Sequence, residues 1–363
     1  MKFLDSRFTQ RLKCLGSMVA ATLIFGLPAQ AQAQTVAVAT AGKNDAIYMY
    51  RGPDREKRLL EKARQEGSLT WYTSMATKES IPLTKAFEKK YGVKVELWRA
   101  TSEKIIQRVI NEGNAKRHTF DVVETNGPEV EMMARENLLS QIYSPHLVDF
   151  PPHAIPKHRL WVTDRLNFFV VGYNTNKIKR EDLPKTYEGF LDPKWKGLIG
   201  IEATDSEWMA TIVKKYGTER GMKLFERLAE MRPDVRKSHI LLAEMVSAGE
   251  VPIALTIYNS EAESLKRHGG PIDWVAVEPT VARPQGLGVA KNAPHPHAAM
   301  LFADYMLSQE GQELLNSMGR VPVNTKVKTN LNNFPYDLID SAATLDESEK
   351  WEAIWNKLFL TKK

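Results

Sequence analysis

The sequence predicts an α/β protein built from two lobes, each a parallel sheet covered by helices. Strand-like and helix-like segments alternate along most of the chain, which is typical of parallel sheets. Residues 143–161 hold four prolines and three histidines without periodicity, and they separate two runs of alternating segments. The length of 363 residues suits about two domains at roughly 150 residues each.

The first 33 residues have the features of a secretory signal peptide. Basic residues precede an apolar stretch, Leu15–Leu27, which is shorter than the roughly 20 apolar residues of a membrane span. Ala-Gln-Ala at 29–31 and again at 31–33 offers cleavage sites, so we expect export to the periplasm and a mature chain starting near residue 32 or 34. Cys14, the only cysteine, is removed with this segment.

The charge of the mature chain is nearly balanced. Without the first 33 residues, 46 basic residues face 43 acidic ones, a formal charge of +3. Proteins that bind nucleic acid concentrate Lys and Arg on one face, and this balance gives no sign of that. We therefore expect no nucleic-acid partner.

The first lobe is predicted from three strand–helix pairs that follow an opening helix. Residues 35–50 show no periodicity and are expected to form a loose arm. A charged helix, Asp54–Glu66, has one apolar side and ends at Gly67. The next helix has Pro82 near its first turn, and later helices begin at Ser102 and at Asn126-Gly-Pro128. The strands alternate or are apolar throughout, and they are expected at 68–73, 93–98 and 121–124.

The second run of segments predicts another αβ unit and a return of the chain. Strands are expected at 168–173, 198–201, 251–257, 273–277 and 286–290. Helices are expected at 206–216, 218–231, 239–248, 297–307 and 308–318, and a final amphipathic helix contains Trp351 and Trp355.

Small polar residues follow four predicted strands where a helix begins, two in each lobe. In open parallel sheets ligands bind beyond these strand ends, where helix N-termini present free N–H groups. Any one of these residues alone fits a simple helix cap, but together they predict a ligand cleft. The candidate ligand-binding residues are Tyr72, Thr73, Ser74, Thr125, Asn126, Glu202, Thr204, Trp208, Tyr258 and Asn259.

Three of these candidates have an alternative interpretation. Trp71 and Tyr72 alternate along one strand, and we expect Tyr72 rather than Trp71 to face the cleft. Trp208, in the first turn of a helix, either closes over the ligand or packs in the core. Glu202 either contacts the ligand or is a solvated loop acid.

Motifs of metal and enzyme chemistry are not found in the sequence. None of the eight histidines forms a zinc-binding helix pattern with a nearby acid. The chain has no Gly-x-Ser-x-Gly elbow, no phosphate-binding glycine loop and no cysteine nucleophile. We expect a protein without catalytic residues or a cofactor. The rival from another class is a two-lobed periplasmic hydrolase, which turnover assays with esters and phosphoesters would detect.

Six phrases in a fixed order resemble the periplasmic solute-binding proteins of ABC importers, in the group that contains the ferric-iron binders. The phrases are Gly67-Ser-Leu-Thr-Trp-Tyr-Thr-Ser74, Ala86-Phe-Glu-Lys-Lys-Tyr-Gly-Val93, Phe120-Asp-Val-Val-Glu124, Val171-Gly-Tyr-Asn-Thr175, Asp192-Pro-Lys-Trp-Lys-Gly197 and Ala303-Asp-Tyr-Met-Leu-Ser-Gln-Glu-Gly-Gln312. The resemblance implies a type II periplasmic-binding-protein fold, in which two αβ lobes are joined by crossover hinge strands and close on a small solute. It also implies an inner-membrane permease and ATPase as partners.

The resemblance sets the expected domain boundaries. The chain should cross between lobes near 161–168 and again near 278–283, and we expect a monomer. The predicted parts are a signal peptide at 1–33, a discontinuous first lobe at 34–160 and 280–345, a second lobe at 161–279, and a C-terminal helix at 346–363.

The nature of the solute stays open between two alternatives. The resemblance implies adjacent tyrosines in ferric binders where this chain has Tyr258-Asn259, and Fe(III) needs several anionic oxygen ligands. We therefore expect a small organic anion or zwitterion, because helix N-termini favour an anion whereas Glu202 and Asp205 favour a cationic group. The alternative is Fe(III) as the transported ligand, held by Tyr258, Glu202 and a bound anion.

Overall fold

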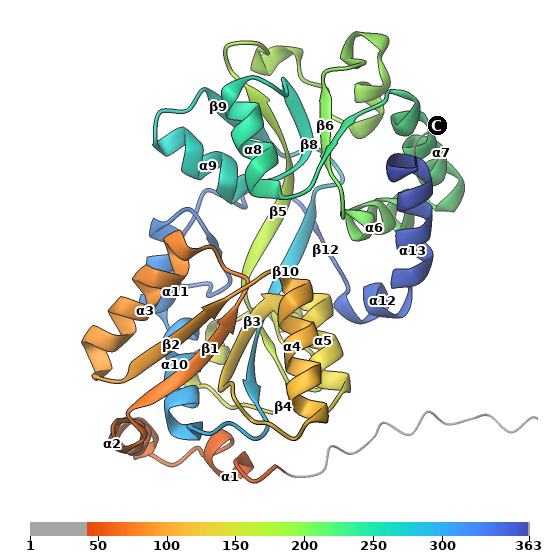
Figure 1. Ribbon diagram of the computed structural model, residues 1–363. Coiled ribbons are helices and arrows are strands. Elements are labelled where there is room, and N and C mark those ends of the chain that lie inside the picture. Colours follow the sequence, from red (N-terminus) through yellow and green to blue (C-terminus); the bar gives the residue numbers. More distant parts are fainter. Residues whose placement is uncertain (1–41, 362–363) are drawn as a thin grey trace, which may run out of the picture. The chain divides into compact units, whose positions relative to one another are not determined.

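The computed structural model describes residues 42–361 and shows one mixed sheet whose two halves lie in two lobes (Figure 1). The strand order along the sheet is β2-β1-β3-β10-β5-β8-β6-β7. The predicted signal peptide and its cleavage sites lie outside the described residues. No helix within residues 42–361 is long and apolar enough to cross a membrane.

Parallel strands with helices between them form the first lobe, as the sequence predicts. The strands β1 and β2 pair in parallel, as do β1 and β3. Both faces are covered, so Leu69, Trp71, Val122 and Val123 are buried. The elements are α2 (Arg55–Glu66), β1 (Ser68–Thr73), α3 (Thr77–Tyr91), β2 (Lys94–Arg99), α4 (Ser102–Asn114), β3 (Val122–Asn126), α5 (Gly127–Arg135) and β4 (Leu139–Ser140).

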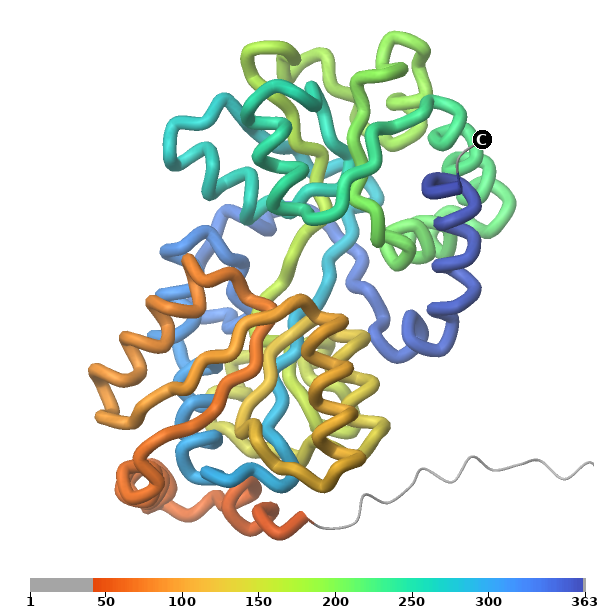
Figure 2. Tube along the Cα trace, viewed as in Figure 1, coloured from red at the N-terminus to blue at the C-terminus, as the bar shows by residue number. Residues whose placement is uncertain are grey.

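Two long antiparallel strands, β5 (Val162–Asn174) and β10 (Val281–Ala290), connect the lobes. Figure 2 shows both running from one lobe into the other. Every residue of both strands is buried, because each strand pairs with neighbours from both sides. The short 3-10 helices η1 (Pro145–Asp149) and η2 (Pro152–Ala154) precede β5 in the proline-rich stretch.

The second lobe repeats the arrangement of strands and helices. Its strand β8 pairs in parallel with β6, which pairs in parallel with β7. The elements are β6 (Ile199–Glu202), α6 (Ser206–Tyr216), α7 (Thr218–Glu230), β7 (Asp234–Arg236), α8 (His239–Ala248), β8 (Ile253–Tyr258), α9 (Asn259–Arg267) and β9 (Ile272–Val275), with 3-10 turns η3 (Arg180–Asp182), η4 (Tyr187–Leu191) and η5 (Pro193–Trp195) before β6.

After β10 the chain returns to the first lobe and then spans both lobes. The helix α10 (Pro296–Leu307) packs on α2, and α11 (Gln309–Ser317) and β11 (Val321–Pro322) follow. Beyond β12 (Asp337–Leu338), α12 (Ser341–Asp346) packs against α5, and α13 (Ser348–Trp355) packs against α6 and continues into a π-helical turn, η6 (Asn356–Leu360) (Figure 1). The residue boundaries expected for the lobes stay a prediction.

Two expectations about the first lobe are wrong. The predicted loose arm contains a helix, α1 (Asp45–Tyr48), and Tyr48 is fully buried, where its hydroxyl donates to the Ala290 carbonyl at 2.9 Å. A helix of one turn is too short to show periodicity. Pro82 does not lie near the start of α3 but inside it, because the helix already begins at Thr77.

Candidate functional site

A cleft of about 240 Å³ lies between the lobes at the C-terminal ends of the parallel strands. Ends of β1, β2 and β3 and the loops after them line it from the first lobe, and ends of β6, β7 and β8 line it from the second. The connecting strands β5 and β10 also contribute side chains. The cleft thus lies where the strand ends of open parallel sheets place a ligand.

Half of the predicted ligand-binding residues line this cleft, and they come from all four predicted strand ends. The five residues are Ser74 after β1, Asn126 at the end of β3, Glu202 and Thr204 at and after the end of β6, and Tyr258 at the end of β8. The structure therefore brings together side chains that lie up to 184 positions apart, between Ser74 and Tyr258.

Tyr72 and Trp208 do not line the cleft. The Tyr72 hydroxyl donates to Glu112 on α4 at 3.0 Å and bonds Thr119 at 3.1 Å, so the side chain lies under the helix layer of the first lobe. The Trp208 ring is fully buried in the second lobe against Tyr187 and Phe225. Of the two alternatives for Trp208, closing over the ligand or packing in the core, the structure shows packing in the core.

Thr73, Thr125 and Asn259 also lie behind the cleft. The Thr73 hydroxyl donates to the Glu124 carboxylate and accepts from the Met75 N–H at 3.0 Å. Thr125 is fully buried, and the Asn259 amide donates to the Leu331 carbonyl at 2.9 Å. These side chains support the strand ends without reaching the cleft.

Several helices begin at the cleft with first-turn N–H groups that no side chain caps. The N-cap residues Ala76 of α3, Thr101 of α4, Asn126 of α5 and Tyr258 of α9 line the cleft and accept no capping hydrogen bond with their side chains. Ser238 of α8 does cap its helix, because its hydroxyl accepts from the Leu241 N–H at 3.3 Å. Uncapped helix N-termini carry partial positive charge and bind anions.

Three nearly buried arginines line the cleft, and the sequence analysis did not predict them. Arg165 on β5, Arg283 on β10 and Arg320 before β11 are 3–6% exposed. Each is paired with carboxylates: Arg165 with Glu124 and Asp164, Arg283 with Asp205 and Glu207, and Arg320 with Glu79 and Glu261. The predicted strands at 168–173 and 286–290 contain neither Arg165 nor Arg283, so no local pattern marked these two residues.

Two further cations in the cleft are exposed and carry no ion pair within residues 42–361. Arg99, at the end of β2, donates only to the Ser74 carbonyl, at 3.4 Å. Lys237, before α8, has no partner among the described side chains. Because their charges are not neutralised by the protein, both are available to an anion in the cleft.

Tyr258 lies beside the Arg283 guanidinium at the end of β8. Its hydroxyl accepts a hydrogen bond from Arg283 Nη1, and its ring stacks on His239 with 4.0 Å between centroids. Burial raises the pKa of Tyr258 well above its ordinary value, although Arg283 opposes the shift. Tyr258 is thus a neutral phenol at pH 7.

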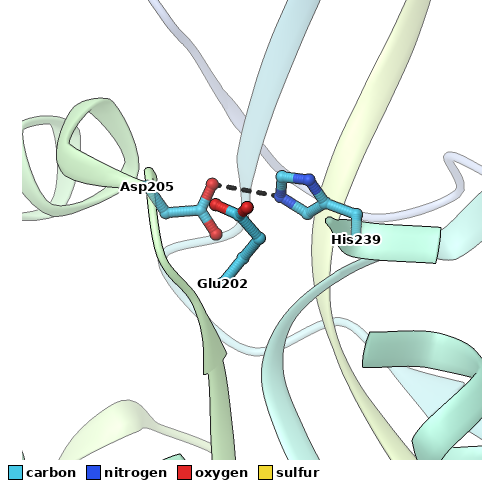
Figure 3. A group of neighbouring side chains, drawn as sticks. All are labelled: Glu202, Asp205 and His239. Carbon is cyan, nitrogen blue, oxygen red and sulfur yellow. Dashed lines mark hydrogen bonds and ion pairs between the residues drawn. The ribbon is translucent and has the colours of Figure 1, made fainter. Parts of the chain in front are cut away.

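Glu202, Asp205 and His239 form a compact group (Figure 3). The His239 ring of this group is the one that stacks on Tyr258. One ligand atom from each lies within 4.8 Å of the others, and His239 Nε2 is 3.0 Å from Asp205 Oδ1. Glu202 accepts from the Ser238 N–H at 2.8 Å and from the Thr204 hydroxyl at 2.7 Å. This donor set suits a metal ion, but the Glu202 contacts also tie the β6 and β7 loops together.

The chain matches the family described as bacterial extracellular solute-binding protein over residues 83–335. It belongs to that family. This member is similar to the major ferric iron-binding protein of Neisseria meningitidis, with 26% identity over 301 residues, 77% of this chain and 89% of that protein. Iron uptake protein A1 of Synechocystis is 22% identical over 282 residues, 73% of this chain and 78% of its own length.

Solved structures confirm the two-lobed fold of this solute-binding protein. Iron-bound HitA from Pseudomonas aeruginosa has a TM-score of 0.71 at 23% identity and covers 80% of this chain and 99% of its own. AfuA from Actinobacillus pleuropneumoniae, with fructose-6-phosphate bound, also has a TM-score of 0.71 at 23% identity, and the match covers 82% of this chain and 99% of AfuA. The chain is thus an extracellular solute-binding protein, as the sequence predicts.

Proposed function

We propose that this protein binds a small organic anion in the inter-lobe cleft and delivers it to a permease. The observation that carries the proposal is the charge of the cleft. Five lining residues are cations and three are carboxylates, and two of the cations, Arg99 and Lys237, lie exposed without an ion pair within the described residues.

The helix N-termini and the cleft volume support the same class of solute. Ala76, Thr101, Asn126 and Tyr258 place uncapped N–H groups around one space, where an oxyanion would accept several hydrogen bonds. A volume of about 240 Å³ lies just below the usual range of pockets for drug-sized ligands, which begins at about 300 Å³. A small phosphate ester, phosphonate or carboxylate fits this description.

Ferric iron is the second candidate, and the Glu202–Asp205–His239 group is the observation that favours it. Relatives named as ferric iron-binding proteins add to it. Two features of the site count against it. Tyr258 is the one tyrosine that lines the cleft among residues 42–361, and its hydroxyl already accepts a hydrogen bond from the buried Arg283 guanidinium, a cation beside any metal it would bind. Fe(III) is a hard cation that prefers anionic oxygen ligands such as phenolate.

The same proposal includes the location, the oligomeric state and the partners of the protein. The family match supports a periplasmic location, a partnership with an inner-membrane permease and ATPase, and the lack of an enzymatic activity. The monomeric state stays a prediction. The predicted signal peptide supports export.

The test of the proposal is a calorimetric titration of the mature chain with methyl phosphate, methylphosphonate and acetate. We expect at least one of them to bind, and Arg99→Ala and Lys237→Ala to weaken it by about 1 kcal/mol each, roughly fivefold. The double variant should lose roughly 25-fold if the two contributions add. Affinity should also fall as salt rises, because exposed charges are screened.

Lys196→Ala serves as the matched control, because Lys196 is exposed in the second lobe and lines no part of the cleft. It should bind like the unaltered chain. A double variant that binds as tightly as the unaltered chain would contradict the assignment of Arg99 and Lys237. Failure of all three anions to bind would reject the organic-anion cleft.

A further inference from the structure

A second cavity of about 410 Å³ adjoins the cleft. The two share Glu103, Asn126, Thr204 and Arg283 in their linings, so they are neighbouring compartments with Arg283 at the boundary. The helices α5 and α6 and the C-terminal helices α12 and α13 form the walls of this second cavity.

Carboxylates outnumber cations in the second cavity. Glu103, Glu129, Glu207 and Glu352 line it, and the one lining cation is Arg283, which already pairs with Glu207 and Asp205. Among residues 42–361, Glu103, Glu129 and Glu352 have no ion-pair partner. The first cavity therefore holds two unpaired cations, Arg99 and Lys237, whereas the described lining of the second holds unpaired carboxylates and no unpaired cation. Unpaired Glu103 lines both cavities.

Among the carboxylates of the second cavity, Glu129 is the one whose protonation a bound cation would alter most. Its carboxylate accepts one hydrogen bond, from the Asn126 amide at 3.2 Å. Burial and the nearby Glu207 raise the pKa of Glu129 to about 7, although Arg283 opposes the shift. Trp351 and Trp355 form part of the wall, and such apolar surroundings strengthen the attraction between opposite charges.

We propose that this second cavity binds a cationic amino group of the solute, so that the transported molecule is a zwitterion. Its anionic head lies in the cleft near Arg99 and Lys237, and its ammonium group passes Arg283 and lies near Glu129 and Glu352. This inference rests on the proposed function, because it needs the anion in the cleft. It narrows the solute from small organic anions to those with an amine on a short chain.

The experiment starts from the anionic head group that binds tightest in the titration above. Compounds are compared in pairs that carry this head group on a chain of two, three or four carbons, one member with a terminal amine and the other without it. For methyl phosphate, the pairs start with 2-aminoethyl phosphate and ethyl phosphate. At the best-fitting length we expect the amine to bind at least tenfold tighter than its partner. The preference should fall to threefold or less in Glu129→Gln and in Glu352→Gln.

Glu352 is exposed on α13, so Glu352→Gln keeps the test valid if Glu129→Gln does not fold. Glu226→Gln is the matched control, because Glu226 is exposed on α7 and lines neither cavity. It should retain the full preference for the amine.

The pH dependence separates a direct role of Glu129 from a structural one. Glu129 faces Glu207 of α6, Arg283 of β10, Glu103 of α4 and Glu352 of α13 around the cavity. Only its charged form attracts an ammonium group, so the affinity ratio of amine to partner should grow from pH 6 to pH 8. The ratio should be flatter in Glu129→Gln.

Equal affinities within every pair would overturn the cation site and leave the anion cleft standing. A preference for the amine that survives both Glu variants would also overturn it. If no member of either series binds, the anion cleft fails, and the cation site fails with it.

Discussion

Arg283→Met should lower the free energy of unfolding by about 3–5 kcal/mol, the usual effect of breaking a buried ion pair. Arg283 is 6% exposed on β10, which connects the lobes. Its guanidinium contacts Tyr258, Asp205 and Glu207, and without it the two carboxylates stay buried and lack this cation. Denaturant unfolding of the mature chain measures the loss.

The pH dependence of this loss follows from the carboxylates. Burial raises the pKa of Asp205 and of Glu207, and Arg283 opposes both shifts. In the variant both pKa values rise further, so both groups take up protons on folding as the pH falls. The loss should therefore be largest near pH 7 and smaller near pH 5.

Two controls accompany Arg283→Met. Arg220→Met removes an exposed pair with Glu188 and should change the stability little. Adding Glu207→Gln to Arg283→Met removes one of the unpaired charges and should recover part of the loss. A loss below about 1 kcal/mol in Arg283→Met would contradict the described ion network.

Trp208→Ala should also lower the free energy of unfolding by about 3–5 kcal/mol, the range for removing a large buried aromatic side chain. The ring packs edge-on against Phe225 at 5.1 Å and Tyr187 at 5.3 Å between centroids. Its Nε1 donates to the Tyr187 hydroxyl at 3.4 Å. Denaturant unfolding checks the change, and Trp208→Phe, which keeps a ring in place, should lose less.

Trp208→Ala also distinguishes a packing role of Trp208 from a role in ligand binding. Because Trp208 does not line the cleft, Trp208→Ala should bind the best anion of the titration within about threefold of the unaltered chain at a temperature where both are folded. A large loss of affinity with little loss of stability would return Trp208 to the ligand site that the sequence suggested.

The strand ends were predictable from sequence because they depend on local patterns. The alternation of strands and helices predicts β1 at Ser68–Thr73 with its observed bounds. Polar residues where a strand ends and a helix begins then predict Ser74, Asn126, Thr204 and Tyr258 near one cleft, because parallel strands end at the same edge.

Orientation of side chains within an element was not predictable in the same way. Trp71 and Tyr72 point to opposite faces of β1, and both faces are covered by the first lobe itself, so neither side chain reaches the cleft. Trp208 lies in the first turn of α6, and only the packing of α7 and α13 against that helix decides which way the ring points.

Long-range ion pairing was also beyond the sequence. Arg283 meets Asp205 and Glu207 across more than 70 positions of the chain, and Arg320 meets Glu79 across 241. His239 shows no metal-binding spacing in sequence, yet the fold places it 3.0 Å from Asp205. Such contacts depend on how β5, β10 and the strand ends meet in space.

The most direct test of the organic-anion cleft is a native mass spectrum and a visible absorption spectrum of the protein isolated from the periplasm without unfolding. We expect the mature chain to retain one small organic molecule and to be colourless, because a cleft that holds an organic anion contains no iron–tyrosinate pair to absorb visible light. The organic molecule should be lost in the Arg99→Ala, Lys237→Ala double variant. A mass increase from iron, with a visible charge-transfer band that disappears in Tyr258→Phe, would contradict the account and establish ferric iron as the cargo.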